Sequence, residues 1–161
     1  MPDKTFTLDE ANTLLPVLQS LLQRAMDSRV GLETIDKQLQ ALGHKIYLNG
    51  GVLVDVAWVN SRKQARERLL QQIKDAVEEI HSTGVQVKDI EIGLLDFPCQ
   101  VEEEIVLLCW KLGEGPQVLH WHGLEEGYAG RRPISSLKAV AEAGTDSNPG
   151  SNPNDEPSQP N

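Results

Sequence analysis

A heptad pattern of apolar residues near the start of the chain most constrains what this sequence can fold into. Apolar side chains recur there at alternating steps of three and four residues over four repeats, with Ser28 in one place of the pattern: Leu14, Leu18, Leu21, Ala25, Leu32, Ile35, Leu39 and Leu42. This spacing lines up one face of an α-helix, and an apolar face of this length must be covered by another element. We therefore expect one long helix that packs against a second helix.

Local signals predict where this first helix begins and ends. Thr7 and Glu10 have the spacing of a capping box, in which each side chain accepts a hydrogen bond from the backbone amide of the other residue. Pro16 has no amide for the carbonyl four residues back, so a kink should separate the capped first turns. Gly43 can end the helix, and the pair Asn49-Gly50 is the strongest local signal for a β-hairpin.

A second amphipathic helix is predicted over residues 55–82. Its apolar face carries Trp58, Ala65, Leu69, Ile73, Ala76 and Ile80. A connection near residues 48–51 would make the two helices antiparallel. The basic cluster of the second helix (Arg62, Lys63, Arg66, Arg68) would then lie level with the acidic residues of the first (Asp27, Glu33, Asp36). Pairing between the helices explains the basic cluster, and an anion or RNA site is the alternative.

After Gly84 the apolar residues fall into short runs that indicate β-strands. These runs cover residues 85–90, 91–97, 105–110 and 118–121, and turn-like separators between them favour an antiparallel meander. The predicted fold class is α+β, a long antiparallel helical hairpin packed on a small three- to four-stranded antiparallel sheet. Residues 1–138 form this single domain, and residues 139–161 form a disordered acidic tail rich in Ser, Asn and Pro.

The last two predicted strands bring together a thiol and two imidazoles. If residues 113–116 form a four-residue hairpin loop, Cys109 lies opposite His120, and His122 shares their face. The other face should be buried under the helices, and it carries Val106, Leu108, Trp110, Leu119 and Trp121.

Cys109, His120 and His122 are ligands that zinc accepts readily. Three protein ligands leave one position open, and a water bound there would permit hydrolysis. A fourth protein ligand could instead come from Asp96, Cys99 or Glu114. The alternative without a metal places the two histidines on a half-exposed sheet face beside a small buried thiol.

A glycine-rich loop follows the last predicted strand and contains two adjacent arginines. Arg131 and Arg132 can grip a carboxylate or phosphate of a cofactor through paired hydrogen bonds. Equally, they can close the loop onto Glu125 and Glu126 or onto acidic helix residues as a structural clamp. Asp96 precedes a proline-containing turn, and we interpret it first as a turn residue at the end of a strand.

Composition and charge narrow the function classes. A net charge of −9 disfavours binding to nucleic acid, because the protein surface repels the phosphate backbone. The sequence shows no run of about 18 apolar residues and no signal-peptide pattern at its N-terminus, so we expect a cytoplasmic protein outside the membrane. In that compartment Cys99 and Cys109 should be free thiols.

The chain resembles a bacterial family known as domain of unknown function 2203. The shared motifs are FTLDEAN followed by LLP (residues 6–16), GLLDFP (93–98), LCW-x-LGE (108–114), WH (121–122) and GRRPI (130–134). The resemblance covers the body of the chain up to Leu137 and implies a recognisable family without an established reaction, ligand or partner. Members of the family commonly have an aromatic residue where this chain has His120. As residues of a shared site, the resemblance therefore favours Asp96, Cys109, Glu114, His122 and Arg131.

Two classes of function follow from these patterns. The heptad seam and the partly apolar second face of the sheet favour a non-enzymatic interaction or regulatory module, which binds a second copy of itself as a homodimer or another protein. The Cys/His cluster favours a zinc-binding protein, with hydrolysis as its chemistry if one ligand position stays open. The sequence has no Ser-His-Asp order, phosphate-binding glycine loop or HExxH motif.

Overall fold

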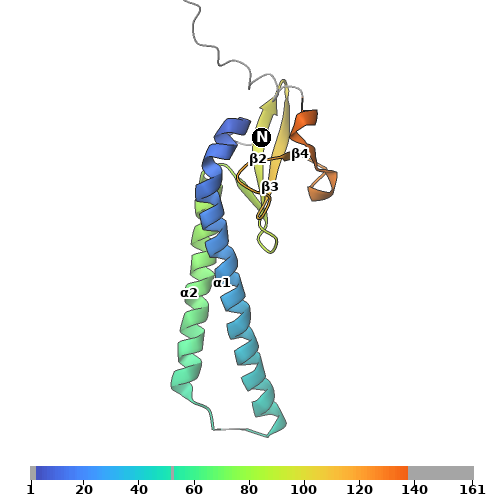
Figure 1. The fold of residues 1–161 in the computed structure, drawn as a ribbon. Coiled ribbons are helices and arrows are strands. Elements are labelled where there is room, and N and C mark those ends of the chain that lie inside the picture. Colours follow the sequence, from blue (N-terminus) through green and yellow to red (C-terminus); the bar gives the residue numbers. More distant parts are fainter. Residues whose placement is uncertain (1–2, 52, 138–161) are drawn as a thin grey trace, which may run out of the picture.

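The protein has an α+β fold in a computed structural model that describes residues 3–51 and 53–137. The elements in chain order are α1 (Leu8–Leu48), α2 (Val56–Ser82), β1 (Gln86–Asp89), β2 (Leu94–Val101), β3 (Glu104–Lys111), β4 (His120–Gly123) and β5 (Arg132–Pro133), with 3₁₀ turns at Tyr128–Gly130 and Ile134–Ser136. Figure 1 shows a helical hairpin that extends far beyond the sheet, which lies beside the start of α1. The predicted fold class is confirmed, with five strands in place of three to four. The tail predicted for residues 139–161 lies outside the described residues.

α1 begins where the sequence predicts but continues beyond the expected end. The Thr7 hydroxyl accepts from the Glu10 amide at 3.1 Å, and the Glu10 carboxylate accepts from the Thr7 amide at 3.4 Å. The helix contains Pro16 and remains one element of 41 residues, so the capped first turns are not a separate segment, while a kink at Pro16 stays a prediction. Burial of apolar side chains on both sides of the proline offsets the lost hydrogen bond. Gly43 does not end the helix, because glycine in a helix interior costs only about 0.5–1 kcal/mol.

In the described residues 49–51 and 53–55, the connection between the helices contains a turn and no β-hairpin. Asn49 caps α1, donating its amide to the Lys45 carbonyl at 3.2 Å, and Gly50 follows with a positive φ of 65°. Asp55 then caps α2 by accepting from the Trp58 amide at 3.0 Å, in agreement with the predicted start of this helix. Within the described ranges, neither helix contains a segment that is long and apolar enough to cross a membrane.

All strands of the sheet are antiparallel neighbours in chain order. Between β3 and β4, Cys109 lies opposite His120, so the predicted register is confirmed. Between β2 and β3, Asp96 lies opposite Cys109, a pairing that the sequence left open. β5 was not predicted, and it adds two residues to the edge of the sheet beside β4.

One face of the sheet forms the core with the helices. The buried side chains on this face of the sheet are Leu95, Phe97, Cys99, Val106, Leu108 and Trp110. They form one apolar cluster with Leu15, Leu18 and Leu22 of α1 and Ile80 of α2. Leu119 was expected on this face, but 49% of its surface is exposed. The prediction is wrong because β4 begins only at His120, so Leu119 precedes the strand.

Candidate functional site

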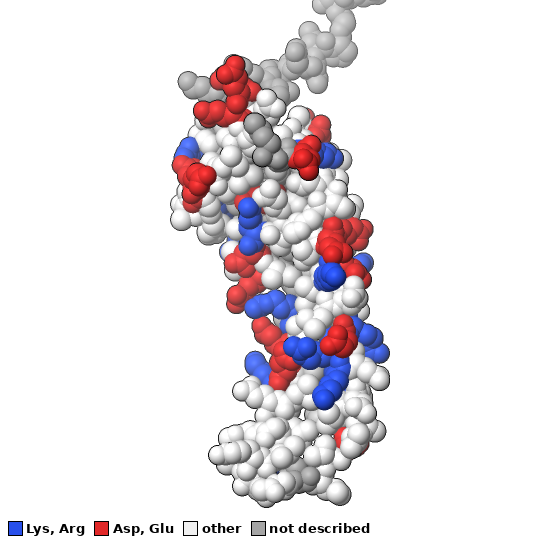
Figure 2. Space-filling view, turned by 180° about the vertical axis from the view of Figure 1, so that it is seen from behind, with Lys and Arg blue, Asp and Glu red and all other residues white. Residues whose placement is uncertain are grey.

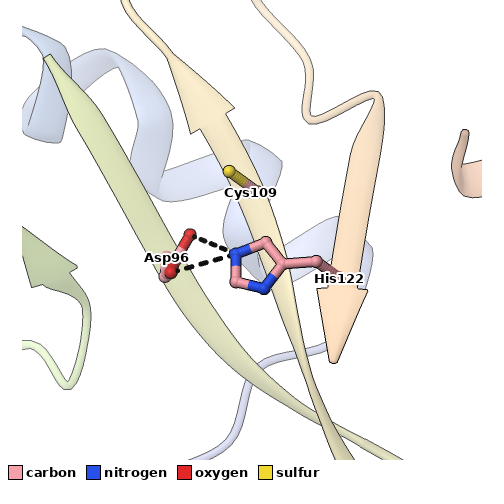
Figure 3. Close-up of side chains that lie close together, drawn as sticks. All are labelled: Asp96, Cys109 and His122. Carbon is pink, nitrogen blue, oxygen red and sulfur yellow. Dashed lines mark hydrogen bonds and ion pairs between the residues drawn. The ribbon is translucent and has the colours of Figure 1, made fainter. Parts of the chain in front are cut away.

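Three potential metal ligands gather on the sheet face that points away from α1. Asp96, Cys109 and His122 come from the adjacent strands β2, β3 and β4, and one ligand atom from each lies within 4.8 Å of the other two. Figure 3 shows the three side chains in front of the strands, with α1 behind the sheet. Their exposed fractions are 1%, 0% and 2%, so this group, which we call the ligand cluster, is fully buried.

The imidazole of His122 has a polar partner at both ring nitrogens. Its Nδ1 lies 2.8 Å from the carbonyl oxygen of Gly123. Its Nε2 lies 3.2 Å from each of the two carboxylate oxygens of Asp96. These contacts fix the orientation of the ring, and they hold Nε2 toward the centre of the ligand cluster.

Cys109 is an unreactive thiol in this environment. Burial raises the pKa of the Cys109 thiol to about 12, and the negative charge of Asp96 adds to the rise, while Arg131 opposes it. The nucleophilic form of cysteine is the thiolate, which is scarce at neutral pH when the pKa is this high. Without a metal to displace the proton, Cys109 is therefore a poor nucleophile.

A second polar group lies next to the ligand cluster and is centred on Arg131. Its guanidinium donates a hydrogen bond to one Glu114 carboxylate oxygen at 2.7 Å and lies 2.6 Å from the other in an ion pair, and it donates to Nδ1 of His120 at 2.9 Å. The Tyr128 ring lies against the guanidinium, 4.9 Å from its central carbon. We call Glu114, His120, Tyr128 and Arg131 the arginine cluster.

The charges of the arginine cluster stabilise one another. Burial alone would raise the pKa of Glu114, but the hydrogen bonds from Arg131 and from the Lys111 amide outweigh it, and the pKa is lowered. Burial also acts to lower the pKa of Arg131, and the bonded Glu114 carboxylate reverses this, so that the pKa is raised. The pair is therefore ionised at neutral pH.

Arg132 makes the other half of the predicted clamp. It forms an ion pair with Glu126 and lies over the Trp121 ring, with 4.5 Å between the guanidinium carbon and the ring centroid. Glu126 also accepts from the Gly123 amide at 2.8 Å. Gly130 passes so close that an added Cβ would lie 2.6 Å from the Cβ of Glu126, which accounts for a glycine at this position.

The structure brings together some of the predicted site residues and separates others. Cys109 and His122 belong to the ligand cluster, whereas His120 faces Arg131 in the arginine cluster. Asp96, expected first as a turn residue, lies within β2 and completes the ligand cluster. Cys99 lies on the opposite face in the core. Zinc binding by Cys109, His120 and His122 stays a prediction.

The predicted ligand grip of Arg131 and Arg132 also stays a prediction. Both guanidinium groups already pair with carboxylates of the same chain, Glu114 and Glu126, so a bound anion would have to displace these partners. The structural clamp describes the contact of Arg132 with Glu126 as predicted, whereas Arg131 pairs with Glu114 and not with the expected glutamates or helix residues. Tyr128 carried no signal in the sequence, because its role depends on how the loop after β4 folds back.

Comparison with known proteins places this chain in a family. The sequence profile of a family described as "Uncharacterized conserved protein (DUF2203)" matches residues 4–134. The chain belongs to this family. No curated protein and no solved structure shows significant similarity to it. For this DUF2203 protein, function must therefore be inferred from the geometry of its own side chains.

The far end of the helical hairpin is a third feature with functional potential. We call residues 44–51 and 53–58 the hairpin tip. Its exposed apolar side chains, with their exposed fractions, are Tyr47 (83%), Leu48 (66%), Leu53 (104%), Val56 (66%) and Trp58 (39%). The hairpin tip contains two charged residues, Lys45 and Asp55, and one histidine, His44. Figure 2 shows this end of the molecule nearly free of charged side chains, which gather higher up the hairpin.

Proposed function

We propose that this DUF2203 protein is a non-enzymatic interaction module that associates with a second copy of itself through its helical hairpin. The observation that carries the proposal is the hairpin tip, where Tyr47, Leu48 and Leu53 are largely exposed. Clustered apolar side chains on a water-facing surface mark an association site in soluble proteins. The burial of each such side chain contributes about 1.5–3 kcal/mol.

The seam between the two helices supports the same proposal. In α2 only Ala76 and Ile80 are buried, and both lie near the sheet. The heptad residues of α1 beyond Ile35, namely Leu39 and Leu42, remain partly exposed. Two hairpins side by side would form a four-helix bundle and cover these side chains, which one hairpin leaves half-covered.

The charges along the hairpin favour a second copy as the partner. At the level where Arg66 of α2 bonds to Asp36 of α1 at 2.7 Å, α2 is rich in basic residues (Arg62, Lys63, Arg66, Arg68). α1 carries Glu33 and Asp36 at this level. A two-fold axis along the hairpin would place α1 of one copy beside α2 of the other, so opposite charges would meet across the interface.

The enzymatic alternative, a zinc hydrolase that uses Cys109, His120 and His122, has less support. Cys109 and His122 are 0% and 2% exposed, so a substrate could not reach a metal between them without opening the sheet face. Nδ1 of His120 accepts from Arg131, which holds this ring in the arginine cluster. These contacts favour a structural role for the site over a catalytic role.

Light scattering on the full chain tests the proposed self-association. We expect the mass of a dimer for the wild type and the mass of a monomer for the double variant Tyr47→Ser, Leu53→Ser. Both side chains are more than four-fifths exposed, so their loss should not unfold the monomer, and circular dichroism checks this. A matched control is Leu124→Ser, an apolar residue of the sheet end with 58% exposure, which should remain dimeric. A monomeric wild type at all concentrations, or a dimeric double variant, would overturn the proposal.

A further inference from the structure

We propose that Asp96, Cys109 and His122 bind one divalent metal ion, best suited to zinc, which ties together strands β2, β3 and β4. This site differs from the sequence prediction because Asp96 takes the place of His120. It is also independent of self-association through the hairpin, since the ligand cluster and the hairpin tip lie at different ends of the molecule (Figure 1).

The first step of the argument is the proton on His122. A backbone carbonyl can only accept a hydrogen bond, so Nδ1, 2.8 Å from the Gly123 oxygen, must be the donor. In a neutral imidazole, Nε2 then carries a lone pair. This lone pair points at the carboxylate of Asp96, whose two oxygens are both 3.2 Å away and also accept. Two acceptors face each other, so a cation is needed between them.

A proton could fill that place, but the third side chain favours a metal ion. Cys109 brings a sulfur atom to within 4.8 Å of both His122 and Asp96. A proton shared by His122 and Asp96 leaves the thiol only a weak hydrogen bond to donate to Asp96, whereas zinc takes nitrogen, oxygen and sulfur ligands together. The contact of Nδ1 with the Gly123 carbonyl fits a metal ligand, since metal-bound histidines commonly donate their other N–H to such an oxygen.

The distances and the charges fit such an ion. Zinc bonds of about 2.0–2.3 Å in a tetrahedral arrangement place ligand atoms roughly 3.3–3.8 Å apart. The Nε2 to carboxylate separation of 3.2 Å is close to this range, and Cys109 needs to approach by no more than about an ångström. Binding transfers the thiol proton to solvent as the sulfur–zinc bond forms. The resulting carboxylate, thiolate, imidazole and divalent ion have no net charge, which suits a buried site.

Burial identifies the proposed ion as structural. All three ligand side chains are at most 2% exposed, and each lies on a different strand. A metal ion there joins the centre of the sheet, and burial keeps a substrate from the fourth position that the three side chains leave open. Its measurable effect is therefore on stability, since a ligand that binds only the folded state raises the melting temperature.

The experiment uses the untagged full chain after treatment with a chelator. One equivalent of zinc should raise its melting temperature by about 5–10 °C, and elemental analysis of protein purified without chelator should find about one metal per chain. Cobalt(II) in place of zinc should give the intense visible bands of a tetrahedral ion and a thiolate-to-cobalt charge-transfer band. These three readouts on the wild type require no substitution, so a variant that fails to fold leaves the test intact.

Variants identify the ligands. Asp96→Asn, Cys109→Ser and His122→Gln should each lose the zinc-induced shift, and Cys109→Ser should lose the charge-transfer band. The matched controls are His120→Gln, the neighbouring histidine of the arginine cluster, and Cys99→Ser, the buried thiol of the opposite face. Both controls should keep the shift. No shift and no cobalt spectrum for the wild type would overturn the proposal, as would an equal shift in Asp96→Asn.

Discussion

The ion pair between Glu114 and Arg131 gives a quantitative prediction for the substitution Glu114→Gln. The Glu114 side chain is 18% exposed and that of Arg131 is 10% exposed, and the guanidinium nitrogens lie 2.6 and 2.7 Å from the two carboxylate oxygens. Glutamine keeps the size of the side chain but has one acceptor oxygen and no charge. The variant therefore leaves a largely buried guanidinium with only half of its paired acceptors.

The magnitude follows from these contacts. A hydrogen bond to a charged group contributes about 1.5–3 kcal/mol, and breaking a fully buried pair costs about 3–5 kcal/mol. His120 still accepts from Arg131, and the pair is not completely buried, so we expect a loss of about 2–3 kcal/mol. For a domain of this size that loss lowers the melting temperature by roughly 5–12 °C.

The effect should depend on pH with a defined sign. The pKa of Glu114 is lowered in the folded protein, against the opposing effect of burial, from an ordinary value of 4.5. A lowered carboxyl pKa contributes stability above 4.5, and this contribution is lost as the pH falls through the folded value. The difference between wild type and Glu114→Gln should therefore be constant at neutral pH and should narrow below pH 4.5.

Urea unfolding followed by circular dichroism measures both expectations. The matched control is Glu126→Gln, which breaks the pair with Arg132, where the side chains are 37% and 45% exposed. Because water screens that pair, its loss should cost much less than the loss of the Glu114 pair. Equal effects of the two substitutions, or a Glu114→Gln difference that persists unchanged into acid, would refute the reasoning.

Three further predictions concern backbone space and thiol access. Gly93 has φ 74°, and an added Cβ would lie 2.8 Å from the Cβ of Leu112, so Gly93→Ala should cost about 2–4 kcal/mol in urea unfolding. Gly43→Ala should instead raise the free energy of unfolding by about 0.5–1 kcal/mol, since nothing lies within 4 Å of the new Cβ. A lower free energy of unfolding would contradict the position of Gly43 in the interior of a helix. Cys99 and Cys109 are buried free thiols, so a disulfide reagent should titrate them only after unfolding, and rapid modification of native protein would be the contrary result.

Local signals were sufficient for much of the fold. Counting outward from a turn expected at residues 113–116 places Cys109 opposite His120, as observed, although the connection between the strands is longer and spans residues 112–119. The capping box at Thr7 and the Asp55 cap mark the starts of both helices. The helix end predicted at Gly43 was wrong because the helix propensity of one glycine is a small effect. Tertiary contacts along a long helix outweigh it.

The candidate site could be predicted only in part, because it depends on contacts between distant segments. No turn signal fixes the pairing of β2 with β3, so the position of Asp96 opposite Cys109 could not be worked out from its neighbours in sequence. His120 shares a strand face with His122, but the loop that carries Arg131 returns to the sheet and engages His120. The partners that a side chain contacts on a sheet face therefore depend on which segment covers that face.

The exposed tip has a different origin from the site. Its apolar residues are visible in the sequence, yet the same residues could equally have formed a covered β-hairpin around Asn49-Gly50. The structure makes them the far end of a long helical hairpin, where the chain has no further element within the described residues to cover Tyr47 or Leu53. Self-association is then the most economical way to remove this surface from water.

The distance between hairpin tips in solution tests the central claim of self-association most directly. A spin label at Asn60→Cys, an exposed polar position near the tip in α2, reacts selectively because both native cysteines are buried. Dipolar spectroscopy should show strong coupling between two labels, and dilution with unlabelled protein should remove it. A label at Glu103→Cys, in the turn after β2, serves as the comparison at the sheet end. Coupling that is absent at Asn60, or that appears only at Glu103, would contradict association through the hairpin.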